Sequence, residues 1–287
     1  MVRSCVLIVP ARDCWPASHR WEMSPNGGLL VPMNEERYGI AGYGSSSYGD
    51  AFADVYDSWY ASLDDDDFAQ YIASLLPDHT STVLELGVGT GRLLDKLVHL
   101  RQHRDHIFGI DSSQAMLERL NARENLAHVS TICGDFSQQL PNATFDLIFV
   151  GYNTLFNLPD NDALSSCLSL VHSRLSPKGL FALDVVVPEA ESTPETVALK
   201  SITTDHVTLS VSRHDHEQQR IIGQFIDITN SGSPTLRPWS VRYWTPSQLD
   251  DLALAAGLKL VTRIADGHGS THCEDDARHI SVYTVAQ

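Results

Sequence analysis

The stretch Val83-Leu-Glu-Leu-Gly-Val-Gly-Thr-Gly91 decides the fold of this 287-residue chain. Its first half is a short apolar run typical of a buried β-strand, and residues 92–100 after it carry Leu and Val at helical spacing. Gly87, Gly89 and Gly91 lie between the two, where a backbone without Cβ atoms can turn tightly and approach a ligand. The stretch therefore predicts a strand, a glycine turn and a helix, with a binding site at the carboxyl end of the strand.

Strands and helices continue to alternate on the C-terminal side of this stretch. We predict further strands at residues 106–110, 129–133, 145–150 and 179–187. Helices are predicted between them at residues 112–122 and 162–175. Two final strands are predicted at 259–264 and 279–285. Such alternation is typical of a parallel sheet covered on both faces. The predicted fold class is α/β, with a doubly wound, seven-stranded and mostly parallel sheet.

Residues 200–244 interrupt this pattern. Apolar and polar side chains alternate there along three stretches, at 207–211, 222–228 and 239–243. A period of two predicts an antiparallel sheet, inserted here into the α/β frame. Thr245 and Pro246 then suit the N-cap and first turn of a helix, which Gly257 is expected to end.

The N-terminal part divides into two regions. Residues 1–45 show no sustained period and are punctuated by Pro, Gly and Ser, so we expect a disordered or non-native arm. Residues 46–81 carry apolar and aromatic positions that predict two helices, which would cap the domain. The folded domain is therefore expected to span residues 46–287.

Composition excludes several classes of protein. Lys and Arg number 20 and Asp and Glu 36, which gives a net charge of −16. Such a chain repels a polyphosphate backbone, so nucleic acid is not an expected partner. The apolar runs are too short to span a bilayer, so no membrane association is expected either.

The cysteines and histidines do not predict a metal site. The five cysteines are scattered, which is typical of reduced thiols and favours a cytoplasmic protein. His214-Asp215-His216 is expected in a solvated turn between two strands of the insert. The loop that contains His268, His272 and Cys273 is more plausible as a substrate loop than as a set of ligands.

Acidic residues end the next two predicted strands. Asp111 follows residues 106–110, where a carboxylate can accept hydrogen bonds from both hydroxyls of a ribose. Asp135 follows residues 129–133 in the same way. Together with the glycine turn, these side chains predict a nucleoside-binding rim along the edge of the sheet.

The spacing of the glycines bears on the kind of nucleoside. A dinucleotide site has the pattern G-x-G-x-x-G, whereas this turn reads G-x-G-x-G and has Glu85 two residues before Gly87. A carboxylate there would repel a pyrophosphate and suits a cationic ligand. The turn, with Asp111, Asp135-Phe136 and Phe145-Asp-Leu-Ile148, resembles that of the class I S-adenosylmethionine-dependent methyltransferases, over about residues 45–287.

Within that superfamily the chain is most similar to small-molecule enzymes, in particular natural-product N-methyltransferases. The similarity lies in the aromatic N-terminal segment, in Asn153 to Asn157 and in the antiparallel insert. The sequence after residue 150 reads Gly151-Tyr-Asn-Thr154. It departs from the D/N-P-P-Y/F sequence of methyltransferases that act on exocyclic amines of nucleic acids, in agreement with the acidic charge.

The resemblance implies a Rossmann-like methyltransferase fold, S-adenosyl-L-methionine as cofactor, and a set of residues that bind it. The glycines would border the methionine and ribose, Glu85 would hold the turn or meet the ammonium group, and Asp111 would bind the ribose. Met116 would lie near the adenine edge, or would equally be a plain core residue of its helix. Asp135 would accept from the adenine amino group, beside the Phe136 main chain, and Gly151 would pass close to the amino-acid end. The cofactor-binding set is Glu85, Gly87, Gly89, Gly91, Asp111, Met116, Asp135, Phe136 and Gly151.

The resemblance also implies groups at the reaction centre. Tyr56 would contact the cofactor carboxylate or close the site, and Tyr152 and Asn153 would face the substrate. Tyr56 could equally be a packing aromatic, and no pattern in the sequence assigns a catalytic base.

The sequence thus predicts an enzyme that transfers a methyl group from S-adenosylmethionine to an amine or hydroxyl of a small-molecule acceptor. Two alternatives stay open at this point, a nicotinamide-dependent oxidoreductase and an S-adenosylmethionine-binding module without catalysis. Nitrogen or oxygen as the acceptor atom and the formation of a homodimer are also left open.

Overall fold

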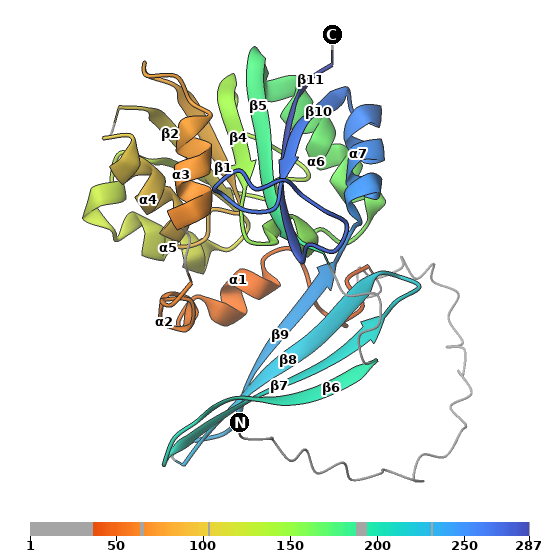
Figure 1. The fold of residues 1–287 in the computed structure, drawn as a ribbon. Helices are drawn as coiled ribbons and strands as arrows, with labels where there is room; N and C mark the ends of the chain where they lie inside the picture. Colours follow the sequence, from red (N-terminus) through yellow and green to blue (C-terminus); the bar gives the residue numbers. More distant parts are fainter. Residues whose placement is uncertain (1–36, 64–65, 103, 188–193, 231, 287) are drawn as a thin grey trace, which may run out of the picture. The chain divides into compact units, whose positions relative to one another are not determined.

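Seven strands form the larger sheet in the order β10-β11-β5-β4-β1-β2-β3 (Figure 1). The computed structural model describes residues 37–63, 66–102, 104–187, 194–230 and 232–286. The chain divides into two units, Met1–Met33 and Asn34–Gln287, and every described residue belongs to the second. The strands of the larger sheet are β1 (Thr82–Leu86), β2 (His106–Asp111), β3 (Ser130–Cys133), β4 (Phe145–Val150), β5 (Leu175–Val186), β10 (Leu258–Ile264) and β11 (Arg278–Val285).

The direction of the strands confirms the predicted fold class. β1 pairs in parallel with both β2 and β4, whereas β11 is antiparallel to its neighbours β5 and β10. The order of the parallel strands reverses between β1 and β4. In open α/β sheets, ligands bind at such a reversal, beyond the carboxyl ends of the strands.

Helices cover both faces of this sheet and bury alternate residues of each strand. On β1, Val83 packs against the face that carries α3, α4 and α5, and Leu84 and Leu86 pack against the face that carries α6 and α7. Because both faces are buried, the central strands are almost entirely apolar. The helices are α3 (Asp66–Ser74), α4 (Arg92–Leu100), α5 (Gln114–Asn121), α6 (Asn161–Arg174) and α7 (Pro246–Ala255), with the short 3₁₀ turns η1 (Glu124–Leu126) and η2 (Thr154–Asn157).

The start of α7 follows the sequence pattern closely. The Thr245 hydroxyl accepts from the main-chain N–H of Gln248, and the Gln248 side chain accepts from the N–H of Thr245. This reciprocal capping box, with Pro246 in the first turn, satisfies main-chain donors that the helix itself leaves open. Gly257 ends the helix with φ = 84°.

The insert is an antiparallel sheet of four strands, where the sequence pattern predicted three. They are β6 (Glu195–Ile202), β7 (His206–Asp215), β8 (Arg220–Thr229) and β9 (Thr235–Arg242), in that order across the sheet. The extra strand is β6, an edge strand that is exposed along its whole length. Its pairing with β7 shifts register between Leu199 and Ser201. An exposed, irregular edge strand has no apolar period, so the pattern missed it.

The N-terminal region differs from the prediction in two ways. Residues 1–36 of the expected arm lie outside the described residues, but the arm does not extend to residue 45, because Tyr38 and Tyr43 are buried. The Tyr38 carbonyl accepts from the Ser240 hydroxyl of β9, at 2.6 Å. This contact is long-range and has no local signature. The cap then contains three helices rather than two, α1 (Ser47–Phe52), α2 (Tyr56–Trp59) and α3.

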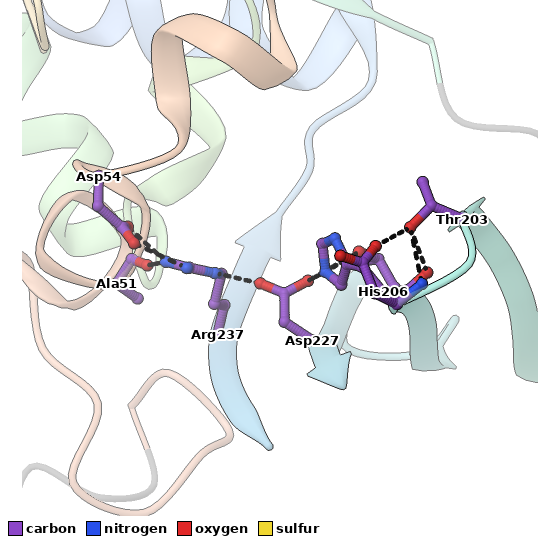
Figure 2. Close-up of polar contacts among 8 residues, drawn as sticks. Ala51, Asp54, Thr203, His206, Asp227 and Arg237 are labelled. Carbon is purple, nitrogen blue, oxygen red and sulfur yellow. Dashed lines mark hydrogen bonds and ion pairs between the residues drawn. The ribbon is translucent and has the colours of Figure 1, made fainter. Parts of the chain in front are cut away.

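One buried arginine joins the cap to the insert (Figure 2). Arg237 of β9 donates through Nε to Asp227 at 2.8 Å, and through Nη1 and Nη2 to Asp54 at 2.5 and 2.8 Å. Its Nη1 also donates to the carbonyl of Ala51. Asp227 in turn accepts from the Thr208 hydroxyl at 2.8 Å. We call this arrangement the Arg237 fork; it holds the connection between α1 and α2 against β8 and β9.

Candidate active site

The turn after β1 has the backbone that its glycines permit. Gly87, Gly89 and Gly91 have φ angles of 65°, 55° and 78°, in the left-handed region that other residues rarely adopt. The N–H of Gly87 donates to the Ile110 carbonyl of β2 at 2.8 Å. A Cβ atom on Gly87 would stand 2.1 Å from Thr154 Cγ2, so no larger residue fits there.

Asp111 fixes this turn from the end of β2. Its Oδ2 accepts from the main-chain N–H of Gly89 at 2.8 Å, and its Oδ1 accepts from that of Ser113 at 2.8 Å. Burial raises the pKa of the Asp111 carboxyl, against the effect of these two donors. Asp111 therefore stands at the rim with its carboxylate beside the glycine turn, where a ribose diol can share it.

Glu85 is the unusual group in the site. The side chain is 5% exposed, and no described residue donates a hydrogen bond to its Oε2 atom. Burial, with the nearby charge of Asp111, raises the pKa of the Glu85 carboxyl well above its usual range. An uncompensated buried carboxylate is costly, so a cationic ligand group at this position would stabilise it.

Two small cavities meet at this turn. The first, of about 70 Å³, is lined from the cap by Ser45, Tyr48, Gly49 and Tyr56, and from the larger sheet by Gly87, Gly89, Asp111, Ser112, Met116, Phe136, Thr154 and Asn157. The second, of about 20 Å³, is lined by Tyr56, Glu85, Gly87, Val88, Arg92, Leu93, Gly151, Tyr152 and Thr154. Both are smaller than the roughly 300–1,000 Å³ of typical ligand pockets.

A cation lines the second cavity together with Glu85. The Arg92 guanidinium, at the start of α4, lies 4.6 Å from the ring centroid of Tyr152 and 5.9 Å from that of Tyr56. Burial raises the pKa of both tyrosines, that of Tyr152 to about 12, and Arg92 opposes the rise. The second cavity thus has a carboxylate and a guanidinium in its wall, which matches the zwitterionic end of an amino acid.

The structure brings most of the predicted residues together, with three exceptions. Gly91 caps α4 and packs against Leu120 and Leu126 rather than against a cavity. Asp135 uses its carboxylate to accept from the N–H and hydroxyl of Ser137, at 2.8 and 2.7 Å. Asn153 accepts from the N–H of Val186 through Oδ1 at 2.7 Å, so its side chain serves the backbone of β5. None of these three residues lines either cavity.

The predicted site set omitted nine lining residues, among them Tyr48, Arg92, Thr154 and Asn157. Arg92 was the easiest to find, because it directly follows the last glycine and begins the helix. Tyr48, Thr154 and Asn157 lie in segments that the sequence analysis singled out for their resemblance to the family, but no local pattern assigned these three side chains to the site.

The histidine-rich segments lie elsewhere. His214 Nε2 is 2.9 Å from the Tyr243 hydroxyl, and the segment borders a separate, open hollow along the ends of β7 and β8. Within the described ranges, no three His, Cys, Asp or Glu side chains gather as metal ligands would. None of the helices described here has the length and hydropathy to cross a membrane.

Comparison with known proteins decides the family. A family model described as a methyltransferase domain matches residues 83–179. The structure of the CcbJ methyltransferase from Streptomyces caelestis is 32% identical, with a TM-score of 0.77 over 85% of this chain and 100% of that one. This chain belongs to the S-adenosylmethionine-dependent methyltransferases.

Curated methyltransferases are also similar to it. An uncharacterised methyltransferase from Anoxybacillus flavithermus is 33% identical over 118 residues, so the chain spans about half, 53%, of that relative's length. The cypemycin N-terminal methyltransferase from a Streptomyces species is 25% identical over 196 residues, 77% of its length. The cofactor of the methyltransferase described here is S-adenosylmethionine, and its glycine turn is not that of a nicotinamide-dependent enzyme.

Proposed function

We propose that this methyltransferase transfers the methyl group to an amine or hydroxyl of a small-molecule acceptor, with an amine favoured. The relatives support this choice by their names. One is an N-terminal methyltransferase of cypemycin, and solved structures of the same fold include a sugar N-methyltransferase and a glycopeptide N-methyltransferase. The acidic net charge of −16 argues against a nucleic-acid acceptor.

The observation that carries the proposal is the pairing of charges around the glycine turn. Glu85 has a buried oxygen without a donor, and Arg92 lies across the same cavity. These two groups would receive the ammonium and the carboxylate of the methionine moiety. Asp111 would accept from the ribose hydroxyls, and Met116 and Phe136 would flank the adenine in the first cavity.

Bound S-adenosylmethionine supplies an electrophilic methyl carbon on a positively charged sulfur. The protein then has to hold that carbon in line with the acceptor's lone pair, and alignment alone can lower the barrier by roughly 7–11 kcal/mol. Tyr56 and Thr154 line both cavities, Asn157 lines the first and Tyr152 the second, so these side chains would shape the approach of the acceptor. A neutral amine carries its own lone pair and loses its proton after attack, so it needs no strong base.

The test is formation of S-adenosylhomocysteine in the presence of acceptors. Purified protein is incubated with S-adenosylmethionine and matched pairs of small amines and alcohols, and the product is quantified for each. Turnover with amines above the level without acceptor supports the proposal. Turnover only with alcohols would reverse the preference, and tight cofactor binding without turnover on any acceptor would favour a module without catalysis.

A further inference from the structure

Two consecutive residues after β4 have strained backbones. Tyr152 and Asn153 have φ angles of 53° and 61°, in the left-handed region. For residues with a Cβ atom such a conformation costs about 1–3 kcal/mol, and it persists only where the surrounding structure holds it. This turn borders both cavities through Tyr152 and Thr154, and contacts from other parts of the fold have to hold it.

Asn153 is fixed at the end of β5 from two sides. Its side-chain Oδ1 accepts from the N–H of Val186 at 2.7 Å, and its own N–H donates to the carbonyl of Asp184 at 3.2 Å. The second bond joins main chain to main chain. Only the first depends on the identity of residue 153, so a variant at this position can remove it alone.

Asp184 fixes the residue before it. The Asp184 side chain is 3% exposed, and its carboxylate accepts from the main-chain N–H of Tyr152. The same carboxylate accepts from Nε and Nη2 of Arg278, at 2.7 and 3.0 Å. Arg278 also donates to Asp67, in the first turn of α3, at 2.8 Å. The strained turn is thus tied through one carboxylate to β11 and α3.

The turn contacts Arg92 through Tyr152. Tyr152 presents its ring to the Arg92 guanidinium, with 4.6 Å between the guanidinium carbon and the ring centroid, a distance typical of a cation–π contact. Without the turn, Tyr152 would leave this position and the guanidinium would lose one wall of its cavity. None of these contacts involves Asp111, Met116 or Phe136, which line the first cavity.

We infer that Asp184 and Asn153 are positioning residues for the methionine end of the methyl donor: they hold Tyr152 in a strained turn against Arg92, the cation that receives the donor carboxylate. The inference rests on the proposed placement of the cofactor. Neither residue touches the cofactor in this arrangement, since both act through Tyr152. The effect of changing them should therefore fall on the amino-acid part of the ligand and spare the nucleoside part.

Two ligands separate these parts. S-adenosylhomocysteine has both, whereas 5′-methylthioadenosine lacks the amino-acid group. For Asp184→Asn we expect about tenfold weaker binding of S-adenosylhomocysteine, the scale of one charge-assisted hydrogen bond, and 5′-methylthioadenosine affinity within about twofold of wild type. Calorimetric titration measures both, and a thermal melt of each variant reports its stability.

A matched control exists on the other side of the fold. Asp250 of α7 receives Arg263 of β10 in the same two-pronged manner, at 2.7 and 3.1 Å, away from both cavities. Asp250→Asn removes a comparable charge and should leave both affinities unchanged. If Asp184→Asn weakens both ligands equally, or neither, the inference is wrong.

Variants at Asn153 test the same inference independently of Asp184. They remain informative if the Asp184→Asn variant does not fold. Asn153→Ala removes the bond to Val186 and leaves the strain, so it should weaken S-adenosylhomocysteine about tenfold. Asn153→Gly removes the bond and the strain together and should restore part of the affinity. An alanine variant with wild-type selectivity between the two ligands would overturn the inference. If wild-type protein binds neither ligand, the proposed placement of the cofactor is itself wrong.

Discussion

Two turns with left-handed backbone stand next to each other in this molecule, one after β1 and one after β4. The first uses glycines, at φ angles of 55° to 78°, and carries no steric strain. The second uses Tyr152 and Asn153 at 53° and 61°, and side chains from β5, β11 and α3 hold it. The same backbone shape is therefore reached in one case by local choice of residue and in the other by contacts across the fold.

Gly87→Ala is the variant with the largest expected effect on these two turns, because the new side chain would act on both of them. The alanine would have to adopt the backbone angle φ = 65°, and its Cβ atom would stand 2.1 Å from Thr154 Cγ2. We expect a loss of about 3 kcal/mol or more in the free energy of unfolding, and no measurable binding of S-adenosylhomocysteine. Urea denaturation and titration measure these effects. Gly44→Ala, with nothing within 4 Å, is the control; equal stability of the two variants would mean that neither the left-handed backbone at residue 87 nor the contact with Thr154 carries a cost.

Glu85→Gln tests whether the carboxylate near the end of β1, just before the first turn, binds a cationic group of the ligand. Burial holds the pKa of Glu85 above its usual range, so in the free protein this carboxyl stays protonated at pH values where an exposed glutamate is ionised. An ammonium group favours the ionised form, so binding releases a proton and affinity rises with pH until the pH exceeds the raised pKa.

We expect the Glu85→Gln variant to lose that pH dependence and to bind S-adenosylhomocysteine about 1.5–3 kcal/mol less tightly near neutral pH. Titration at two pH values, and in two buffers of different ionisation enthalpy, measures affinity and proton release. Glu118→Gln, on the exposed side of α5, is the control. A Glu85→Gln protein that keeps the wild-type pH slope would rule out Glu85 as the titrating group.

Asp111→Ala tests the first turn from the end of β2, because Asp111 holds the glycine turn as Asn153 holds the second turn. The variant should weaken S-adenosylhomocysteine and 5′-methylthioadenosine alike, by about 1–3 kcal/mol, through loss of charge-assisted hydrogen bonds to the ribose. The domain should remain folded by circular dichroism. Wild-type affinity for both ligands would remove the ribose assignment.

Gly89→Ala should have the smallest effect on stability. No atom lies within 4 Å of the Cβ position, so the cost is that of the left-handed backbone at φ = 55°, about 1 kcal/mol. Urea denaturation of the cofactor-free protein measures this cost. A loss as large as that of Gly87→Ala would mean that strain, and not the contact with Thr154, dominates at both glycines.

The sequence predicted the first turn well because its determinants are local. Glycine spacing, the apolar run of β1 and the acid at the end of β2 lie close together in the chain and identify the element and its chemistry. The family comparisons then confirmed the fold class, the cofactor and the enzymatic class. Helix α4 has the predicted bounds, and the capped start of α7 follows from Thr245 and Pro246.

The features that the sequence did not predict depend on contacts between residues that are distant in the chain. Asn153 was expected to face the substrate, because a polar residue after β4 gives no indication that Val186 would occupy its oxygen. Tyr38 and Tyr43 were assigned to the arm, although the Tyr38 carbonyl has its partner 202 residues away on β9. Strand β6 has no partner on its outer edge among the described strands and so no burial pattern to detect.

The Arg237 fork has a consequence for the rate of the catalytic cycle. Tyr48, Gly49 and Tyr56 of the cap line the two cavities proposed to hold the cofactor, and the fork ties the connection between α1 and α2 to the insert. With the cofactor placed as proposed, we expect release of the spent nucleoside to require movement of that connection, which would separate Arg237 from Asp54. The residence time of S-adenosylhomocysteine is thereby coupled to an ion pair on the acceptor side, and salt that weakens the pair should shorten it.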